Sequence, residues 1–413
     1  MKGILLIIDG LGDLPNKLLE DKTPLEAANT PNMDFFAARG EMGSMYPVKL
    51  GFVPESDEAL LSIFGNVSCG NCRGQFEAIG AGLKMTRGDL ALRVNFATID
   101  SLKSGKIVDR RVGRTLSSEE IELLSKSLNK INLPVKFEFV PTIQHRAVLV
   151  FRGGMSEGVS GNDSTYSVGR VNFQEMIKAC SPNDDEENSH YTANVLNEFI
   201  EKAYLALKDH PVNLNRIKRG LMPANYLLLR SAGVDIPKLN DYRKWCSMCY
   251  MPLEIGFSIA SGMKTLSFEY PKLKGIDAYE NLFEGLDKAC KFAVKVIKKQ
   301  KNNFDYCYVH LRETDFPGHD NKPVEKKIML EEIDKKFFKF LRNFAPPNKI
   351  KVAVTGDHST PCKLKTHSAD PVPVLLYNFQ IPKERHFNEA EARKGSLGKF
   401  EGKDFLEKIG FDE

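Results

Sequence analysis

Three apolar stretches of the chain predict the centre of the fold. Ile4–Ile8 is continuously apolar, which is typical of a strand that is buried on both faces of a parallel sheet. Asp305–Leu311 is also strand-like, and Lys351–Tyr377 is typical of a strand, a polar loop and a second strand. The pattern therefore predicts an α/β fold built on buried strands.

Apolar residues at helical spacing predict helices around these strands. The longest are expected over Tyr279–Gln300 and Glu325–Asn343, with lysine-rich faces in solvent, and a short one over Phe405–Ile409. Near the N-terminus, Thr30 is a candidate N-cap that places Pro31 at the first helical position.

Composition narrows the class of protein. The chain has 413 residues and a formal net charge of +4, so neither a nucleic-acid tail nor a membrane-surface helix is expected. No window of about 20 residues is apolar enough for a transmembrane helix, and Ile4–Ile8 is too short for a signal-peptide core. We therefore expect a cytoplasmic protein of two or three domains that binds neither nucleic acid nor membranes.

The eight cysteines do not suggest a disulfide framework in a chain of this length. Cys69/Cys72 and Cys246/Cys249 have a Cys-x-x-Cys spacing, and together they could hold a structural zinc ion. However, Cys246 begins a strand-like run, in which a period of two places it and Cys249 on opposite faces. Packing is the simpler interpretation, and zinc is the alternative.

A carboxylate follows each predicted strand, and histidines follow two of the three. They are Asp9 after the first, Asp315 and His319 after the second, and Asp357, His358 and His367 after the third. Ligands of open α/β sheets bind at the carboxyl ends of strands, and carboxylate and imidazole ligands suit Zn, Mn or Fe. The alternative is a polar loop with solvated histidines, but the convergence of three strand ends favours a metal site.

Ser56 is expected near the N-terminus of a short helix that follows a glycine- and proline-containing loop. Unpaired N–H groups and the helix dipole favour an anion at such a position. A serine there is most often only an N-cap, so this residue alone does not establish a catalytic role.

Several short motifs are distributed along nearly the whole chain. They are Asp9-Gly-Leu-Gly-Asp13, Lys22-Thr-Pro-Leu-Glu-Ala-Ala, Thr30-Pro-Asn-Met-Asp34, Ser56-Asp57-x-Ala, Arg73-Gly-x-Phe-Glu-Ala, Asp315-x-x-Gly-His319, Asp357-His-Ser-Thr-Pro-Cys and His367-Ser-Ala-Asp-Pro-Val-Pro. Together they resemble the archaeal-type 2,3-bisphosphoglycerate-independent phosphoglycerate mutases, which belong to the alkaline phosphatase superfamily. The metal-type motifs are specific for the superfamily, and the connecting motifs point to this family.

The resemblance implies a site for two divalent metal ions. One ion is expected on Asp315, His319 and His367, and the other on Asp9, Ser56, Asp357 and His358. Mn²⁺ is the first expectation, with Mg²⁺, Co²⁺ or Zn²⁺ as alternatives. All seven positions carry the expected residue type, which argues against a catalytically silent relative.

The implied activity is the interconversion of 3-phosphoglycerate and 2-phosphoglycerate in glycolysis and gluconeogenesis. Ser56 would attack the phosphate, and the bound glycerate would then take the phosphoryl group back on its other hydroxyl. Metal activation suits this scheme because a hydroxyl is otherwise a weak nucleophile. The alternative is a metal-dependent phosphatase or phosphodiesterase that acts on another ester. The oligomeric state stays open.

The resemblance also implies two domains in a discontinuous arrangement. We expect an alkaline-phosphatase-like core of residues 1–75 and 235–413, with a mostly parallel sheet flanked by helices, and an inserted smaller α/β domain of residues 76–234. Guanidinium groups bind carboxylate and phosphate in bidentate fashion. Five arginines of the insertion are therefore candidate substrate ligands, namely Arg93, Arg110, Arg114, Arg146 and Arg230. The alternative is that many are surface residues.

Some positions differ from the family pattern. Glu55 precedes Ser56 where glycine is usual, which places a carboxylate near the incoming phosphate. Arg312 stands where lysine is common, and the segment around Asp163 replaces a more usual Asp-Thr-Asp-Pro-His. These differences concern the substrate geometry more than the metal site.

Overall fold

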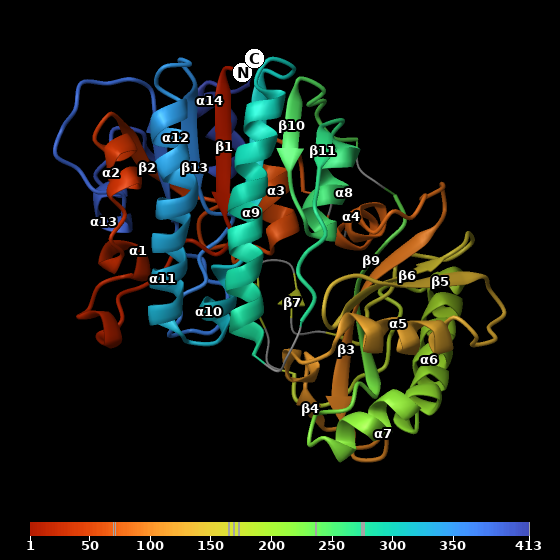
Figure 1. Ribbon diagram of the computed structural model, residues 1–413. Coiled ribbons are helices and arrows are strands. Elements are labelled where there is room, and N and C mark those ends of the chain that lie inside the picture. The colour runs from red at the N-terminus through yellow and green to blue at the C-terminus, as the bar shows by residue number, and fades with distance from the viewer. Residues whose placement is uncertain are drawn as a thin grey trace.

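The computed structural model describes residues 1–68, 70, 72–163, 166–167, 170–171, 174–235, 238–273 and 277–412. Its larger part is built on an eight-stranded sheet (Figure 1). The strand order across this sheet is β11 (Lys264–Leu266), β10 (Trp245–Met248), β12 (Tyr306–Leu311), β1 (Gly3–Ile8), β13 (Lys351–Thr355), β14 (Val372–Tyr377), β2 (Gly40–Tyr46) and β15 (Gly398–Glu401).

The larger sheet is mostly parallel, as the sequence predicts. The central strand β1 pairs in parallel with β12 and β13, and β10 and β11 continue in the same direction. Strand β14 runs antiparallel to both of its neighbours. All six residues of β1 are buried, as expected for a strand that is covered on both faces.

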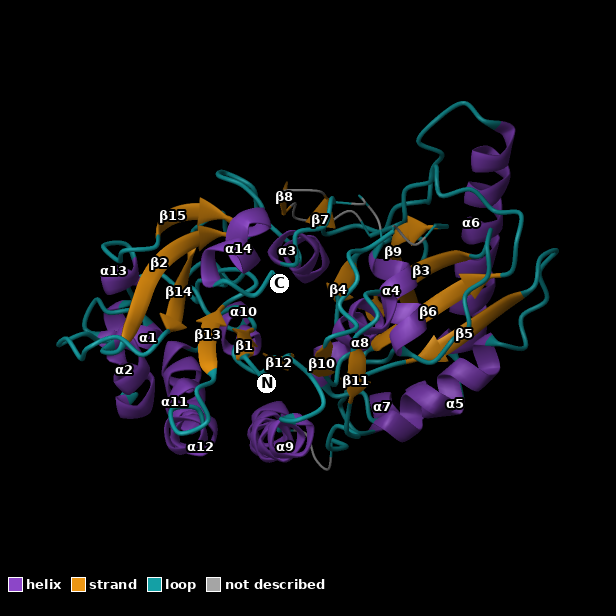
Figure 2. Ribbon diagram, turned by 90° about the horizontal axis from the view of Figure 1, so that it is seen from above, coloured by secondary structure: helices purple, strands orange, loops and turns teal. Residues whose placement is uncertain are grey.

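Helices cover both faces of this sheet (Figure 2). On one face, alternate residues of β1 pack in a core with α9 (Ala278–Gln300), α11 (Pro323–Ile333) and α12 (Lys339–Phe344). On the other face, the intervening residues of β1 pack with α3 (Ser56–Ile63), α8 (Pro252–Ala260) and α14 (Phe405–Ile409). The alternation of side chains along a strand thus divides one apolar run between two cores.

The predicted helices agree with these elements. Helix α9 begins one residue before the expected start, and α14 has the expected bounds. The stretch predicted over Glu325–Asn343 is helical, but a π-helical turn at Asp334–Phe338 separates α11 from α12. Helix α2 (Pro31–Ala37) begins at Pro31 as expected, and Thr30 has the N-cap position, but its side chain makes no capping hydrogen bond. The last short helices of this part are α1 (Pro24–Ala27), α10 (Asp315–His319) and α13 (Glu389–Ala392).

A second, antiparallel sheet lies beside the first (Figure 2). Its central strand is β3 (Leu90–Ile99), and its other strands are β4 (Ile107–Asp109), β5 (Phe137–Pro141), β6 (Arg146–Phe151) and β9 (Tyr226–Gly233). Helices α5 (Ser118–Leu128), α6 (Glu187–Lys208) and α7 (Pro211–Lys218) accompany it. The two helices α5 and α6 share a separate hydrophobic core with the sheet. The short strands β7 (Tyr166–Ser167) and β8 (Arg170–Val171) pair with each other.

Helix α4 (Arg73–Gly80) joins the two parts of the molecule. It contacts α8 of the larger part and β3 of the smaller sheet. The approach to α8 depends on glycine, because a Cβ atom on Gly80 would lie 1.8 Å from the carbonyl oxygen of Pro252. No helix of the described residues combines the length and the apolar character that a membrane span requires.

The cysteines do not support a four-cysteine zinc site. Cys246 packs in the core on one face of the larger sheet, whereas Cys249 packs in the core on the opposite face. Cys72 is disulfide-bonded, and Cys69 lies outside the described residues. The packing interpretation therefore holds for Cys246 and Cys249.

Candidate active site

The carboxyl ends of three adjacent parallel strands bring the predicted metal ligands together. Two groups form in the described residues, Asp315 with His358 and His367, and Asp9 with His310 and Asp357, each with its ligand atoms within 4.8 Å of one another. Asp9, Asp315 and Asp357 each follow a strand of the central trio β1, β12 and β13. The arrangement arises because neighbouring parallel strands end at the same edge of a sheet.

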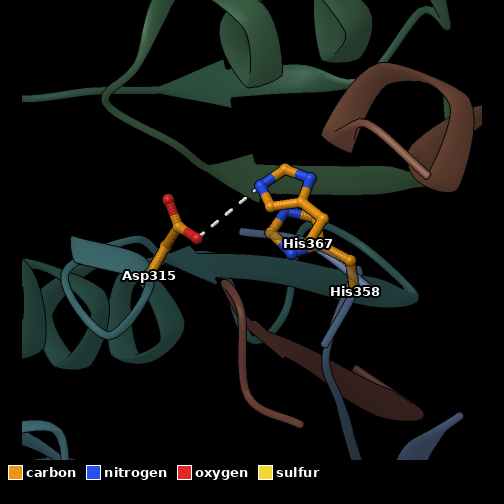
Figure 3. A group of neighbouring side chains, drawn as sticks. All are labelled: Asp315, His358 and His367. Atoms are coloured by element: carbon orange, nitrogen blue, oxygen red, sulfur yellow. Dashed lines mark ion pairs between the residues drawn. The ribbon is translucent and has the colours of Figure 1, made fainter. Parts of the chain in front are cut away.

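The predicted histidines are oriented by hydrogen bonds at Nδ1. The partner is a carbonyl or hydroxyl oxygen at 2.8 to 3.0 Å in each case: Lys365 for His319, Pro54 for His367 and Thr360 for His358. The Nε2 atoms consequently face carboxylates. His319 Nε2 lies 3.4 Å from the Asp315 carboxylate. His367 Nε2 lies 3.8 Å from the same carboxylate, and Figure 3 shows these two side chains facing each other. Such outer hydrogen bonds are typical of histidines that bind metals through Nε2.

His358 lies between the two groups of ligands. Its Nε2 is 3.3 Å from an oxygen of Asp9 and 3.3 Å from an oxygen of Asp357, and its ring stacks on that of His367 with centroids 3.7 Å apart. Thr360 connects two residues of the first group, because its hydroxyl donates to Asp315 Oδ1 at 2.8 Å and lies 3.0 Å from His358 Nδ1.

The donor set fits divalent cations. Asp9 Oδ1, Asp357 Oδ2 and His310 Nε2 are buried and lack a hydrogen-bond partner, and such buried polar atoms call for an explanation. Burial raises the pKa of Asp9 well above its ordinary value, and the nearby carboxylates of Asp357 and Asp315 raise it further. A bound cation would relieve this repulsion, and carboxylate and imidazole groups are suitable ligands for Mn²⁺ or Zn²⁺.

His310 is a candidate ligand that the sequence analysis missed. It lies within β12, with Nε2 3.8 Å from Asp9 and 3.9 Å from Glu254, and Nδ1 2.7 Å from the Tyr308 hydroxyl. Burial lowers the pKa of this imidazole, but the nearby carboxylates of Asp9, Glu254 and Asp357 outweigh burial and raise it to about 9. A histidine inside an otherwise apolar strand was the available signal.

Ser56 is the first residue of α3 and is 7% exposed. The N-cap is Glu55, so the interpretation of Ser56 as an N-cap is wrong. Its hydroxyl oxygen lies 3.3 Å from His358 Nε2. The helix therefore holds a serine hydroxyl against the predicted metal ligands.

An arginine-rich cavity of about 140 Å³ opens beside Ser56. Four of the five arginines singled out in the sequence line it, namely Arg93, Arg110, Arg146 and Arg230. Arg114 does not: it pairs with Asp320 at 2.6 Å and lines a small adjoining cavity. Three further arginines, Arg73, Arg111 and Arg312, line the main cavity without having been singled out. The sequence gives little indication that these three arginines line a cavity, because arginines are mostly surface residues.

Carboxylates partly neutralise this cavity. Glu55 lies 2.7 Å from Arg73, and Glu77 lies 2.9 Å from Arg73 and 3.5 Å from Arg93. Burial, together with the charges of Arg230 and Arg73, lowers the pKa of Arg93 to about 9. Burial and neighbouring guanidinium groups likewise hold the pKa of Arg146 well below its usual range. An anion in the cavity would reduce this repulsion.

Asp163 belongs to the segment that differs from the family pattern, and it also lines the cavity. Its carboxylate pairs with Arg110. Residues 164 and 165, which follow it, lie outside the described residues.

Serine, carboxylates and imidazoles at one end and guanidinium groups at the other are features of an α/β enzyme that acts on anionic substrates. Residues 37–213 match the family model described as 2,3-bisphosphoglycerate-independent phosphoglycerate mutase. A protein of that name from Pyrococcus furiosus is 40% identical over 414 residues, which cover 98% of this chain and 95% of the relative. Its counterpart from Thermococcus kodakarensis is 40% identical over 418 residues, with the same coverage.

Two solved structures resemble the model over nearly its full length. A Pyrococcus horikoshii protein has a TM-score of 0.75 and 31% identity, with 100% of this chain and 98% of that chain covered. The cofactor-independent phosphoglycerate mutase of Thermoplasma acidophilum has a TM-score of 0.57 and 27% identity, with 99% of each chain covered. The chain belongs to the 2,3-bisphosphoglycerate-independent phosphoglycerate mutase family.

Proposed function

We propose that this enzyme interconverts 3-phosphoglycerate and 2-phosphoglycerate through a phosphoserine at Ser56, a step of glycolysis and gluconeogenesis. The observation that carries the proposal is the position of Ser56. Its hydroxyl oxygen lies 3.3 Å from His358 at the edge of a cavity that arginines also line. A nucleophile and an anion-binding wall thus share one cavity.

Two divalent ions would be held by the predicted ligands, with Mn²⁺ the first candidate. One set is Asp315, His319 and His367, and the other is Asp9, Ser56, Asp357 and His358, with His310 beside the second set. When bound, such ions neutralise phosphate charge and activate a hydroxyl nucleophile. The hydrogen bonds at Nδ1 of the histidines would keep Nε2 directed at the ions.

Residues 76–234 would act as an inserted substrate-binding domain, and residues 1–75 and 235–413 would form the metal-binding core. All strands of the smaller sheet lie between Leu90 and Gly233, which supports this division. Arg93, Arg146 and Arg230 stand on these strands and would bind the phosphate and carboxylate of the substrate. We place the enzyme in the cytoplasm, because its charged substrate does not cross membranes unaided.

The group transfer balances without a co-reactant. Ser56 Oγ forms a bond to phosphorus while the bond from phosphorus to O3 of the substrate breaks. The proton lost by the serine hydroxyl corresponds to the proton gained by O3. The reverse transfer then joins phosphorus to O2 of the glycerate while the bond from phosphorus to Ser56 Oγ breaks, and the proton lost by O2 corresponds to the proton regained by the serine. Water must stay out during this exchange, which the burial of lining residues such as Ser56, Arg93 and Arg230 favours.

A coupled assay tests the proposal. Chelator-treated protein receives 3-phosphoglycerate and Mn²⁺ without bisphosphoglycerate, and 2-phosphoglycerate is followed through enolase while free phosphate is measured. We expect metal-dependent 2-phosphoglycerate without phosphate release. Phosphate release alone would indicate a phosphatase on the same core. The absence of both products would contradict the proposed reaction.

A further inference from the structure

Glu55 is an unusual occupant of the arginine cavity. Its side chain reaches into the cavity, where Oε2 lies 2.7 Å from Arg73, 3.2 Å from Arg230 and 3.8 Å from Arg93. Three guanidinium groups around one carboxylate oxygen form the arrangement that arginines make around a bound anion. Glu55 therefore has the position of a ligand, although it belongs to the chain.

Glu55 is poorly placed to bind a metal ion. Its Oε1 lies 3.9 Å from His367 Nδ1, but that nitrogen already bonds the carbonyl oxygen of Pro54 at 2.8 Å. The Nε2 atom of the same ring, which faces Asp315, points to the metal ligands. Glu55 thus lies behind His367 relative to the metal ligands, on the side of the arginines.

Glu55 is also not required to hold Arg73 in place. Arg73 pairs with Asp57 at 3.2 Å and with Glu77 at 2.9 Å, and both of these carboxylates are buried. Glu55 forms a capping box with Glu58, in which the Glu55 backbone N–H donates to Glu58 at 2.9 Å and the Glu55 side chain accepts from the Glu58 backbone, a role that the amide oxygen of glutamine can keep. A neutral side chain of the same shape at this position should therefore leave α3 and Arg73 in place.

Charge gives Glu55 a specific effect on binding. Its carboxylate satisfies one anion position among the arginines, so a second anionic group at that position would meet like charge and lose the same guanidinium partners. Like charges in close contact discriminate strongly between ligands. A substrate with one phosphate and one carboxylate must fit around Glu55, whereas the position that an additional phosphate would need is already occupied by the Glu55 carboxylate.

We propose that Glu55 is a specificity-determining residue that fills one anion position of the arginine cavity and so weakens the binding of free phosphate and of esters with a second phosphate. The inference rests on the proposed function, because it assumes that the cavity binds the phosphoglycerate. It goes beyond that function in assigning a role to the residue next to the nucleophile.

The test measures binding of inorganic phosphate and of 2,3-bisphosphoglycerate by titration calorimetry. The proteins are the chelator-treated wild type, Glu55→Gln and Glu55→Gly, and thermal melting verifies that each is folded. We expect both variants to bind both ligands about tenfold more tightly or better, since a repelling charge is removed. Glu138→Gln is the matched control, because Glu138 pairs with Arg152 away from the cavity, and it should bind as the wild type does.

Unchanged or weaker binding in the folded Glu55 variants would overturn the proposal. Weaker binding would also show that Glu55 holds the arginines in their binding geometry. Calorimetry does not depend on turnover, so the outcome is separate from that of the mutase assay. Mutase activity with no gain in phosphate binding would reject the role of Glu55 alone. A gain in phosphate binding without mutase activity would reject the reaction and keep the role of Glu55 in anion binding.

Discussion

The two ends of the active-site cavity are built in different ways. At the end with the predicted metal ligands, called the metal-ligand end, the three aspartates follow adjacent parallel strands within a few residues, and their positions follow from the backbone. At the arginine end, long side chains come from strands, a helix and loops that are far apart in the sequence, and carboxylates such as Glu77 hold them. The first end is specified by local sequence, whereas the second depends on packing between the two parts of the molecule.

The comparison indicates how the chemistry is divided. The end with Ser56 would perform phosphoryl transfer, and its ligands tolerate little displacement. The arginine end would select and retain the substrate, and its charge balance can vary through residues such as Glu55. Changes at the first end should therefore abolish turnover, and changes at the second should alter substrate affinity.

The largest expected effect follows from Ser56→Ala. Removal of the nucleophile should lower turnover by about a thousandfold or more, because groups that act as a unit lose most of the catalysis together. The coupled enolase assay measures this loss, and thermal melting should remain close to that of the wild type. Substantial activity in a folded Ser56→Ala protein would exclude the phosphoserine scheme.

A second prediction separates arginines inside and outside the cavity. Arg146→Ala should raise KM for 3-phosphoglycerate by about tenfold to a hundredfold, the worth of a hydrogen bond to a charged group. Arg114→Ala should have a smaller effect, because Arg114 pairs with Asp320 and does not line the main cavity. Steady-state kinetics of both variants measures the difference. Equal effects would mean that Arg114 also binds the substrate, as the sequence analysis expected.

Thr360 tests the precision of the metal-ligand end. Thr360→Val removes the hydroxyl that joins His358 to Asp315, and metal affinity should fall by about tenfold to a hundredfold. Thr360→Ser keeps the hydroxyl and should restore most of the affinity. Titration calorimetry of Mn²⁺ binding to the chelator-treated wild type and variants measures these affinities directly. Equal Mn²⁺ affinity of Thr360→Ser and Thr360→Val would show that the bridging hydrogen bonds do not contribute to metal binding.

The prediction with the smallest expected effect on turnover concerns stability at a distance from the cavity. Glu389 accepts hydrogen bonds from the Thr23 hydroxyl and from the backbone N–H of Asp13, which itself pairs with Lys326. Burial raises the pKa of Glu389 to about 7. The folded protein then retains a proton that the unfolded chain loses near pH 4. The associated stability is full below that pH and is lost as the pH rises toward 7, by up to about 3 kcal/mol.

Glu389→Gln should remove this pH dependence, because its side chain does not titrate. Chemical denaturation at pH 5 and pH 7 should show the free energy of unfolding falling less in the variant than in the wild type. Glu391→Gln, on the same short helix α13, serves as the control and should retain the decline. An equal decline in wild type and Glu389→Gln would place the titrating group elsewhere.

Local sequence determined the metal-ligand end almost completely. Apolar runs such as Ile4–Ile8 identify buried strands, and the three aspartates follow those strands within a few residues, so their convergence could be predicted from strand direction alone. The motifs then identified the family, which the comparisons confirm. His310 was not predicted as a ligand because it lies within a strand rather than in the loop after it.

The arginine end was decided only by the tertiary structure. Nothing in the local sequence distinguishes Arg114, outside the main cavity, from Arg111, inside it, because the difference depends on how the smaller sheet packs beside the larger one. The same is true of Glu55, whose three arginine partners come from α4, β3 and β9. Short-range patterns specify strands and the residues after them, but contacts between distant segments arise only when the chain has packed.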